Sequence, residues 1–551
     1  MPKKEGGQIT SKDIQGMISK WASIPFGIVV VLVAGGALNL VPYFLDLKDK
    51  LGFEPIHQEF IRWGVLFGYF GGLLAGPIVD IIGTTISFLI AAVIAGAGFV
   101  GLAFYTDSSN VNTFNSIVIV SLVLLVSFSC AIATIASIAT VIKNFSRNVG
   151  ALIAAVMISY YYAAQYFDTS IRNGYFEDLD LKVNMLVSGG IHFLVYVLAS
   201  FIVDENEQSR ELKRASSITD RLGIFIYAAI AGCFLAVVYF TCIIAEQYQL
   251  SIVLMSVIIL ANFVALAFTV QAMIGQIENN DLSGIRDEPM PPKKNFAQML
   301  AEGRYWFLLI GTFIVIGTGS TYFINASDVA TAVGNADLAD KVDYAYWISA
   351  VSAILGGGMV AALFNQFINA WLFAAIAAFA SMAGFALVFL SQTNDFFYYL
   401  SAFFIGAGTG GWWVVVPQII LDDAGPKSFE SLWGMTLSVN SFGMFVFDRF
   451  FWWVSEKTEP TKPGNCDGTS CYLITFVAFG ALCMIAGILC LVGLSQDEGT
   501  GGDNDEKRPL KSSDANSSGR RSRSGKKDKG DKKSKKSSSK KKSKSKSKAK
   551  R

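Results

Sequence analysis

The chain has 551 residues, of which 52% are hydrophobic and only 16% are charged, and its mean hydropathy is +0.46. A soluble protein of this length is usually about 25% charged, whereas the apolar residues here come in blocks too long for core helices or strands. The composition excludes a soluble enzyme, a secreted disulfide scaffold and a disordered protein, and it predicts a polytopic membrane protein.

In chain order, about fourteen apolar blocks are near the ~20 residues that a helix needs to cross ~30 Å of hydrocarbon. We expect spanning helices at 21–45, 59–81, 85–106, 113–142, 147–170, 185–203, 222–245, 250–274, 304–325, 344–364, 370–391, 396–420, 428–454 and 471–494.

The spans indicate an internal repeat. The first span (21–45) and the ninth (304–325) end in similar sequences, and each precedes a polar loop and a glycine-rich span. Eight spans separate the two starts, so both six-helix halves have the same orientation, as in transporters whose site lies between the halves. The sequence predicts an N-terminal segment at 1–20, an N-terminal bundle at 21–203, a linker with two extra transmembrane helices at 204–303, a C-terminal bundle at 304–494 and a disordered tail at 495–551.

Basic residues gather in the loops of one side, which predicts that side to be cytoplasmic. They precede the first span and lie between spans 4 and 5, 6 and 7, 8 and 9, and 12 and 13, whereas the opposite loops are more acidic. Both termini are therefore expected in the cytoplasm, and we expect the plasma membrane rather than an organelle membrane.

The tail has a charge opposite to that of the body. Residues 507–551 carry 21 Lys and Arg against 3 Asp and Glu, so a net charge of −16 is left for the first 506 residues. This Ser/Lys/Gly segment cannot bury a core. Beneath a bilayer its nearest anionic partner is lipid headgroups, at about 1 kcal/mol per basic residue, rather than nucleic acid; a merely solvated tail is the alternative.

A short motif at the predicted cytoplasmic end of the second span runs from Gly76 to Gly83 and contains Asp80. A carboxylate there can accept hydrogen bonds from the N-terminus of a neighbouring helix and interact with its partial positive charge. The expected partner is the start of span 428–454, near Ser428 and Ser431. The motif predicts a gate latch; the alternative is an acid that only caps a turn.

Several segments resemble the nodulin-like branch of the major facilitator superfamily. They are Tyr43 with Leu51-Gly52-Phe53, the run Gly64, Gly68, Gly72, Gly76 and Asp80, the segments 143–150 and 317–325, and the late segment from Gly406 through Trp412-Trp413 and Pro417 to Asn440. The chain departs from the general signature at Thr84 and Thr85, where basic residues are usual. The resemblance implies an all-α facilitator fold and solute transport, without a substrate.

In such a fold, spans 1, 4, 9 and 12 would line a cavity, with spans 2, 5, 10 and 13 beside them. Polar and aromatic residues on these spans would hold a small polar organic solute by hydrogen bonds and ring contacts. The candidates are Asn39, Tyr43, Tyr161, Gln165, Tyr322, Asn325, Trp412, Trp413, Asn440 and Arg449. The alternatives are aromatic packing or a membrane-interface belt, and hydrogen bonds between helices that only stabilise packing.

Asp448 and Arg449 are adjacent charges inside a predicted span. Neighbours on a helix point about 100° apart, so each needs its own partner. Arg449 can hold a substrate carboxylate, and Asp448 can carry a coupling proton if burial raises its pKa. Alternatively, both lie in the outer third, with Arg449 extended toward headgroups.

Cysteines and histidines add little. Cys466 and Cys471 flank a polar stretch and would close a small disulfide if that loop faces an oxidising compartment, while the two histidines, His57 and His192, are too far apart to indicate a metal site. The sequence predicts a secondary transporter without cofactors, moving a small polar or anionic solute of the monocarboxylate or amino acid class by uniport or proton coupling. The alternative is a receptor or scaffold of the same fold that acts through its basic tail; an enzyme is not expected.

Overall fold

The computed structural model describes residues 11–36, 55–105, 113–145, 147–175, 180–203, 215–216, 218–245, 247–278, 286–287, 294–332, 351, 369–391, 393–458 and 470–505. The chain divides into two units, Met1–Thr500 and Gly501–Arg551. The described part of the second unit is residues 501–505, so the fold below is that of the first.

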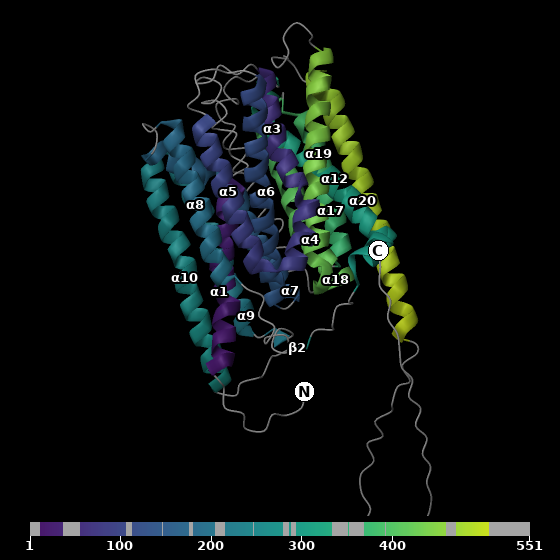
Figure 1. The fold of residues 1–551 in the computed structure, drawn as a ribbon. Helices are drawn as coiled ribbons and strands as arrows, with labels where there is room; N and C mark the ends of the chain where they lie inside the picture. Colours follow the sequence, from purple (N-terminus) through teal and green to yellow (C-terminus); the bar gives the residue numbers. More distant parts are fainter. Residues whose placement is uncertain are drawn as a thin grey trace, which may run out of the picture. The chain divides into compact units, whose positions relative to one another are not determined.

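The described residues are almost entirely helical (Figure 1). The N-terminal half contains α1 (Ser11–Gly36), α3 (Pro55–Phe70), α4 (Gly72–Ile82), α5 (Thr84–Tyr105), α6 (Thr113–Asn144), α7 (Arg147–Tyr175) and α8 (Leu181–Ile202). The linker contains α9 (Ile218–Val237), the π-helix η4 (Val238–Ile244) and α10 (Tyr248–Glu278). The C-terminal half contains α11 (Phe296–Leu300), α12 (Gly303–Ile324), α13 (Ala326–Ala332), α17 (Ala370–Val388), α18 (Asp395–Ala424), the 3-10 helix η6 (Pro426–Ser428), α19 (Phe429–Thr458) and α20 (Ser470–Asp505).

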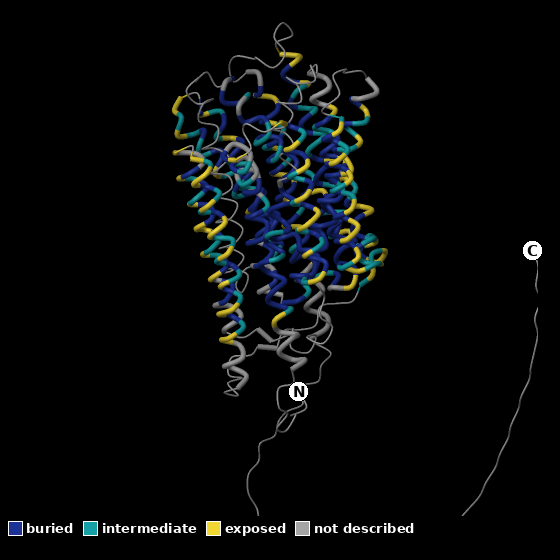
Figure 2. Tube along the Cα trace, turned by 60° about the vertical axis from the view of Figure 1, so that its left-hand side comes forward, coloured by how far each residue is buried: buried dark blue, intermediate teal, exposed yellow. Residues whose placement is uncertain are grey.

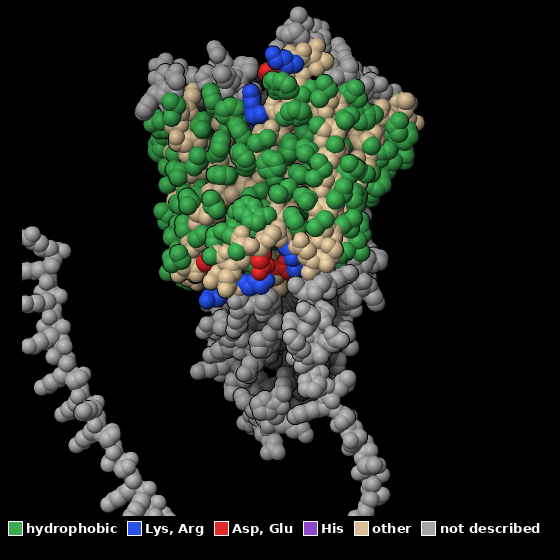
Figure 3. All heavy atoms as spheres, turned by 90° about the vertical axis from the view of Figure 1, so that its right-hand side faces the viewer, with side chains coloured by type: hydrophobic (Ala, Val, Ile, Leu, Met, Phe, Trp, Pro, Cys, Tyr) green, Lys and Arg blue, Asp and Glu red, His purple; other side chains and the backbone are tan. Residues whose placement is uncertain are grey.

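Ten of the described helices are long and apolar enough to cross a membrane. Expected spans 147–170, 222–245 and 428–454 are also helical, as α7, α9 with η4, and α19, while span 344–364 lies outside the described residues. Hydrophobic side chains form a broad band over one face, with charged side chains at its two ends (Figure 3). The chain is thus an all-α, multi-pass membrane protein, and the count of fourteen spans stays a prediction.

Several helices differ from the expected spans. Helix α1 already begins at Ser11, within the segment expected to precede the first span, and the second span is divided at Gly71. The seventh span ends in a π-helical turn. Helix α20 continues to Asp505, past the expected boundary at 494.

One strand pair was not expected from the sequence. Strands β1 (Ala215–Ser216) and β2 (Arg286–Asp287) pair antiparallel, so the segment before α9 meets the segment after α10. Loops carry no long hydrophobic periodicity, and a two-residue pairing between distant loops therefore leaves no sequence signal. The pairing joins the two ends of the linker's helix pair.

Helix packing follows the two halves. Helix α5 packs against α6 and α8, α17 against α18, and α12 against α19, while the linker helices α9 and α10 pack against α7 of the N-terminal half. Buried residues lie between the helices and exposed ones on their outer faces (Figure 2). The two halves meet where α3 and α4 run along α19 and also where α7 packs against α18, and the interface of α3 and α4 with α19 carries the candidate site.

Candidate functional site: two polar clusters between the halves

Glycines allow α4 and α19 to pack with their backbones in contact. A Cβ atom on Gly434 would lie 2.3 Å from the carbonyl oxygen of Gly72, and one on Gly76 would lie 2.3 Å from the carbonyl oxygen of Glu430. Real Cβ atoms do not approach that closely, so only glycine fits at these positions without movement of the helices. Small residues that let spanning helices approach closely are a common device of membrane proteins.

Two further glycines end the helices next to this contact. Gly83 follows α4 with a φ of 81°, and its N–H donates to the carbonyl oxygen of Val79; Gly425 follows α18 with a φ of 78°. Glycine adopts this left-handed region without strain. The predicted motif residue Gly83 therefore shapes the turn after Asp80, while its own surroundings are open.

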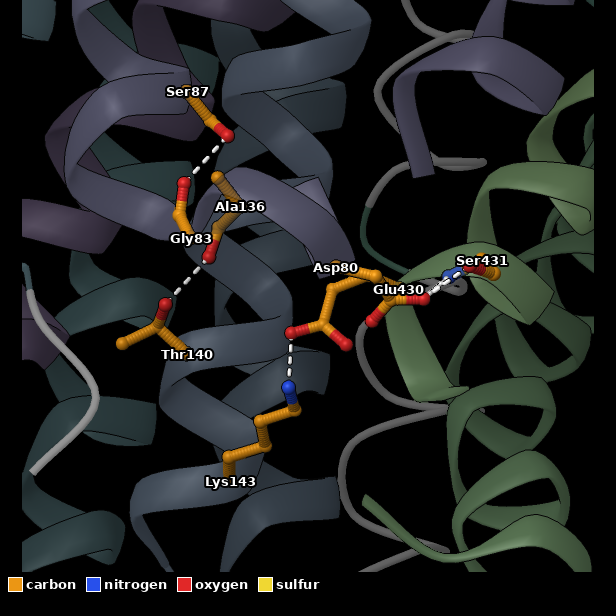
Figure 4. Close-up of polar contacts among 8 residues, drawn as sticks. All are labelled: Asp80, Gly83, Ser87, Ala136, Thr140, Lys143, Glu430 and Ser431. Carbon is orange, nitrogen blue, oxygen red and sulfur yellow. Dashed lines mark hydrogen bonds and ion pairs between the residues drawn. The ribbon is translucent and has the colours of Figure 1, made fainter. Parts of the chain in front are cut away.

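Asp80 of α4 lies against the first turn of α19, as its motif predicts. The N–H of Ser431 donates to Asp80 Oδ2 across 3.0 Å, and the Ser431 hydroxyl donates to the same oxygen (Figure 4). Ser431 is in the first turn of α19, where backbone N–H groups have no partner within the helix and the helix dipole is positive. The carboxylate of one half thus binds the helix N-terminus of the other.

A second acid crosses the interface in the opposite direction. Glu430 of α19 accepts a charged hydrogen bond from Lys143, at the end of α6, and both side chains are buried, with 3% and 9% of their surfaces exposed (Figure 4). Charges this deeply buried persist in proteins when they are paired. Asp80, Lys143, Glu430 and Ser431 form what we call the Asp80 cluster. Lys143 thus provides a positive charge near the position where basic residues are usual and this chain has Thr84 and Thr85.

Between its ends the interface is aromatic. Phe445 of α19 contacts Trp63 and Phe67 of α3, with ring centroids 5.4 and 5.3 Å apart, and Phe442 contacts Phe70 at 6.2 Å. Ring pairs at these distances contribute beyond the area that they bury. The described part of α19 therefore remains in contact with α3 above the glycine contact with α4.

The other end of the interface carries a second polar cluster. Asn325, at the end of α12, donates to Asp448 Oδ1 across 2.8 Å, and the Arg62 guanidinium of α3 lies 3.8 Å from Asp448 Oδ2. The Asp448 side chain is 6% exposed and that of Arg62 is 29% exposed. Arg62 therefore joins the N-terminal half to an acid of the C-terminal half.

Trp63 and Arg449, which follow Arg62 and Asp448 in the chain, also contact each other, and here the cation belongs to the C-terminal half. The Arg449 guanidinium of α19 lies over the Trp63 ring of α3, 5.4 Å from its centroid, which is within the range of a cation–π interaction. As expected for helix neighbours, Asp448 and Arg449 have different partners. Arg62, Trp63, Asn325, Asp448 and Arg449 form what we call the Asp448 cluster.

The two clusters are separated by the same number of residues along α3 and α4 as along α19. Arg62 and Asp80 are eighteen residues apart, as are Glu430 and Asp448, which corresponds to ~27 Å at ~1.5 Å per helical residue. This separation is close to the ~30 Å thickness of a bilayer's hydrocarbon core. Each cluster thus lies near one boundary of the apolar band.

Among the other predicted substrate residues, those that the structure describes do not gather in one place. Asn39, Tyr43, Cys466 and the side chains of Gln165 and Cys471 lie outside the described part of the structure. Tyr161 is half-buried on α7, where its backbone and ring pack beside Gly35 of α1. The proposed disulfide and the first-span contacts therefore stay predictions.

Three aromatic candidates are packed within the C-terminal half. The Tyr322 hydroxyl is 3.1 Å from Ser401 Oγ, and its ring contacts Phe385 and Phe476. Trp412 Nε1 donates to Thr312 Oγ1 across 3.0 Å, and Trp413 packs on Trp433. Tyr322 and Trp412 are fully buried in this structure, and their role in binding a solute stays a prediction.

Asn440 differs from these residues. It is 8% exposed, and its Oδ1 has no hydrogen-bond partner among the described residues. At 100° per residue, Asn440 lies between the face of α19 that packs on α4 and the face that packs on α12. An amide oxygen at this position can accept a hydrogen bond from a hydroxyl or an amine, and its role in binding a solute stays a prediction.

Sequence analysis did not assign the cross-half partners Arg62, Trp63, Lys143 and Glu430 to the site. Each was visible as a charge or tryptophan within two turns of a predicted span end. Such residues are also usual as membrane-interface anchors, so the signal did not distinguish them.

No protein-family model and no curated protein matches the chain. Among solved structures, it is similar to the MFS (major facilitator superfamily) proton:xylose symporter XylE bound to 6-bromo-6-deoxy-D-glucose, with 12% identity, a TM-score of 0.51, and coverage of 87% of this chain and 95% of that one. A partially occluded, inward-open structure of the xylose transporter XylE from E. coli aligns with 13% identity and a TM-score of 0.47, over 87% of this chain and 97% of that one.

The similarity defines the class of fold. The chain is a multi-pass membrane protein with the major facilitator fold, carrying two additional helices, α9 and α10, between its halves. The nodulin-like branch stays a resemblance, based on the motifs quoted above.

Proposed function

We propose that the protein is a secondary transporter that works by alternating access. The observation that carries the proposal is the interface between α3–α4 and α19, whose two ends each hold reciprocal polar contacts between the halves. Contacts of this kind break as units when the halves rock, whereas the aromatic and glycine contacts between them allow sliding. The Asp80 cluster then closes the cytoplasmic side, and the Asp448 cluster closes the opposite side.

The cargo that we propose is a small polar or anionic organic molecule. Asn440 carries, on the inner face of α19, an amide oxygen that accepts no hydrogen bond from the residues that the structure describes. Arg449 is held by Trp63 in this structure and becomes available to a carboxylate when the Asp448 cluster opens. The solved structure that the chain resembles is that of a proton:xylose symporter, so pentoses and hexoses belong in the test with monocarboxylates and amino acids.

The experiment is uptake of this solute panel into liposomes, with and without a pH gradient, by the full chain and two variants. Asp80→Asn removes the charge that binds the α19 N-terminus, and we expect it to lower uptake at least about tenfold, the factor that corresponds to ~1.4 kcal/mol. Glu456→Gln neutralises an exposed acid near the end of the same helix and is the matched control. Full uptake by Asp80→Asn, or no uptake of any solute by the parent chain, would contradict the proposal.

A further inference from the structure

The second span contains a break that divides it into α3 and α4. At Gly71 the ψ angle is −7°, where a regular α-helix has about −42°. The hydrogen bonds there are those of a 3-10 turn: the N–H of Gly71 donates to the carbonyl oxygen of Gly68 across 3.1 Å, and the N–H of Leu74 donates to that of Gly71 across 2.9 Å. A short 3-10 turn inside a longer helix often marks a hinge.

A side chain of the other half stabilises this break. In a continuous helix the N–H of Leu74 would donate to the carbonyl oxygen of Phe70. In the structure the Phe70 oxygen accepts a hydrogen bond from the hydroxyl of Ser438, in α19, across 2.6 Å. Ser438 Oγ is also 3.0 Å from the carbonyl oxygen of Gly434 in its own helix, so the hydroxyl keeps an acceptor if the two helices separate.

The two parts of the span are packed on different halves. A Cβ atom on Gly68 would lie 2.6 Å from the carbonyl oxygen of Leu124, so α3 is in backbone contact with α6 of its own half. The backbone contacts of α4 through Gly72 and Gly76 are instead with α19. Helices α3 and α4 follow one another beside α19 (Figure 1), and Gly71 is the junction between these two kinds of contact.

The other end of α4 also ends in a glycine. Gly83 has a φ of 81° and no atom near its Cβ position, and α5, which packs on α6 and α8, begins at the next residue. Glycine has more backbone conformations available than any other residue. Helix α4, eleven residues long, can therefore change its direction without movement of α3 or α5.

We propose that Gly71 is a hinge and that α4 is the moving part of the cytoplasmic gate. In the closed state Ser438 holds the Phe70 oxygen and the span is broken. On opening, α4 leaves α19, the N–H of Leu74 takes over the Phe70 oxygen, and the span becomes continuous. Ser438 is a positioning residue for this change. The inference rests on the proposed alternating access and specifies how its cytoplasmic side opens: one helix moves, in place of a rotation of a rigid N-terminal half.

The test measures distances in the full chain in nanodiscs, without a solute. Spin labels at Ile81→Cys and Phe201→Cys join α4 to α8 of the same half, labels at Ile81→Cys and Lys427→Cys span the two halves, and labels at Phe60→Cys and Phe201→Cys are the control within the N-terminal half; all four sites are exposed. The exposed Cys233 and the undescribed cysteines carry Cys233→Ser, Cys242→Ser, Cys466→Ser and Cys471→Ser. Double electron–electron resonance then gives each distance distribution.

Asp80→Asn weakens the contact of α4 with the α19 N-terminus and should increase the open population. We expect the Ile81–Lys427 distance to lengthen and the Ile81–Phe201 distance to change with it, while the Phe60–Phe201 distance keeps its parental value. Because Ile81 lies ~15 Å along the helix from Gly71, a bend of ~20° at the hinge moves it by ~5 Å.

Ser438→Ala tests the positioning residue. It removes the donor to the Phe70 oxygen, so the ratio of closed to open populations at the Ile81–Phe201 pair should fall about fivefold, the factor that corresponds to one net hydrogen bond. Ser441→Ala is the matched control, because the Ser441 hydroxyl donates to the carbonyl oxygen of Leu437 within α19 across 3.0 Å. This variant should keep the parental distances.

The possible failures are distinguishable. If the Ile81–Lys427 distance lengthens in Asp80→Asn while the Ile81–Phe201 distance stays constant, the N-terminal half rotates as a rigid body, and the hinge is wrong although alternating access stands. Equal responses of Ser438→Ala and Ser441→Ala would overturn the role of Ser438. If the parent transports none of the solutes in the liposome panel, the proposed function itself fails.

Discussion

Single residues in the C-terminal half show why a polar or aromatic side chain in a span is a weak indicator of a binding site. The sequence predicts Trp412, Tyr322 and Asn325 as solute contacts because polar groups are costly in lipid. In the structure each has its hydrogen-bond partner on a neighbouring helix: Thr312, Ser401 and Asp448. Their sequence positions are the same whether they bind a solute or a helix, and only the partner decides between the two.

Trp412 gives a direct test of this distinction. Trp412→Phe and Thr312→Val each remove the hydrogen bond between α18 and α12, and each should lower stability by about 0.5–1.5 kcal/mol, with a coupling of similar size in the double variant. Unfolding in detergent mixtures measures the stabilities. Solute uptake at equal amounts of folded protein should stay within about twofold of the parent, and a selective loss of uptake in Trp412→Phe would instead make the indole a solute contact.

At the scale of elements, α19 connects the two ends of the interface. Its first turn binds Asp80 and Lys143 through Ser431 and Glu430, and its sixth turn binds Arg62 and Trp63 through Asp448 and Arg449. Because a helix is stiff over five turns, a tilt that separates one end of α19 from the N-terminal half also changes the contacts at its other end. This geometry links the two polar clusters without any contact between them.

The Lys143–Glu430 pair predicts strong non-additivity. Lys143→Met leaves the buried Glu430 carboxylate without its partner, which should cost about 3–5 kcal/mol or open the Asp80 end. Adding Glu430→Gln removes the stranded charge, so the double variant should be closer to the parent than Lys143→Met alone. Unfolding in detergent measures the stability, and the distance between spin labels at Ile81→Cys and Lys427→Cys measures opening of the Asp80 end. Additive losses of stability would show that the ion pair does not join the halves.

At the scale of the whole molecule, the proposed transporter and the alternative of a receptor or scaffold differ in the part of the chain that carries the function. A transporter needs the helical body, whereas a scaffold of the same fold needs the basic tail, residues 507–551. A chain ending at Asp505 should therefore keep its uptake and its thermal stability within error. Binding to vesicles with anionic headgroups should weaken, by about 1 kcal/mol for each basic residue that had been close to the surface. Loss of uptake on truncation would favour the scaffold.

The sequence by itself determined the class of protein and the order of its helices. Hydrophobic length is a local property, so it identifies spans, whereas the orientation from basic residues and the two halves from the repeat of glycine-rich spans stay predictions. The motif ending at Gly83 also indicated the partner of Asp80, because a carboxylate at a span end has few ways to be satisfied other than a neighbouring helix N-terminus.

Apart from the contact of Asp80 with Ser431, only the tertiary structure decided which side chains meet across the interface. Arg62 and Asp448 are separated by 386 residues, and Lys143 and Glu430 by 287. No local pattern encodes such a pairing, because it depends on the antiparallel register of α3–α4 against α19. That register is set by the backbone contact of Gly72 and Gly76 with Gly434 and Glu430, and the charges then lie opposite one another at both ends.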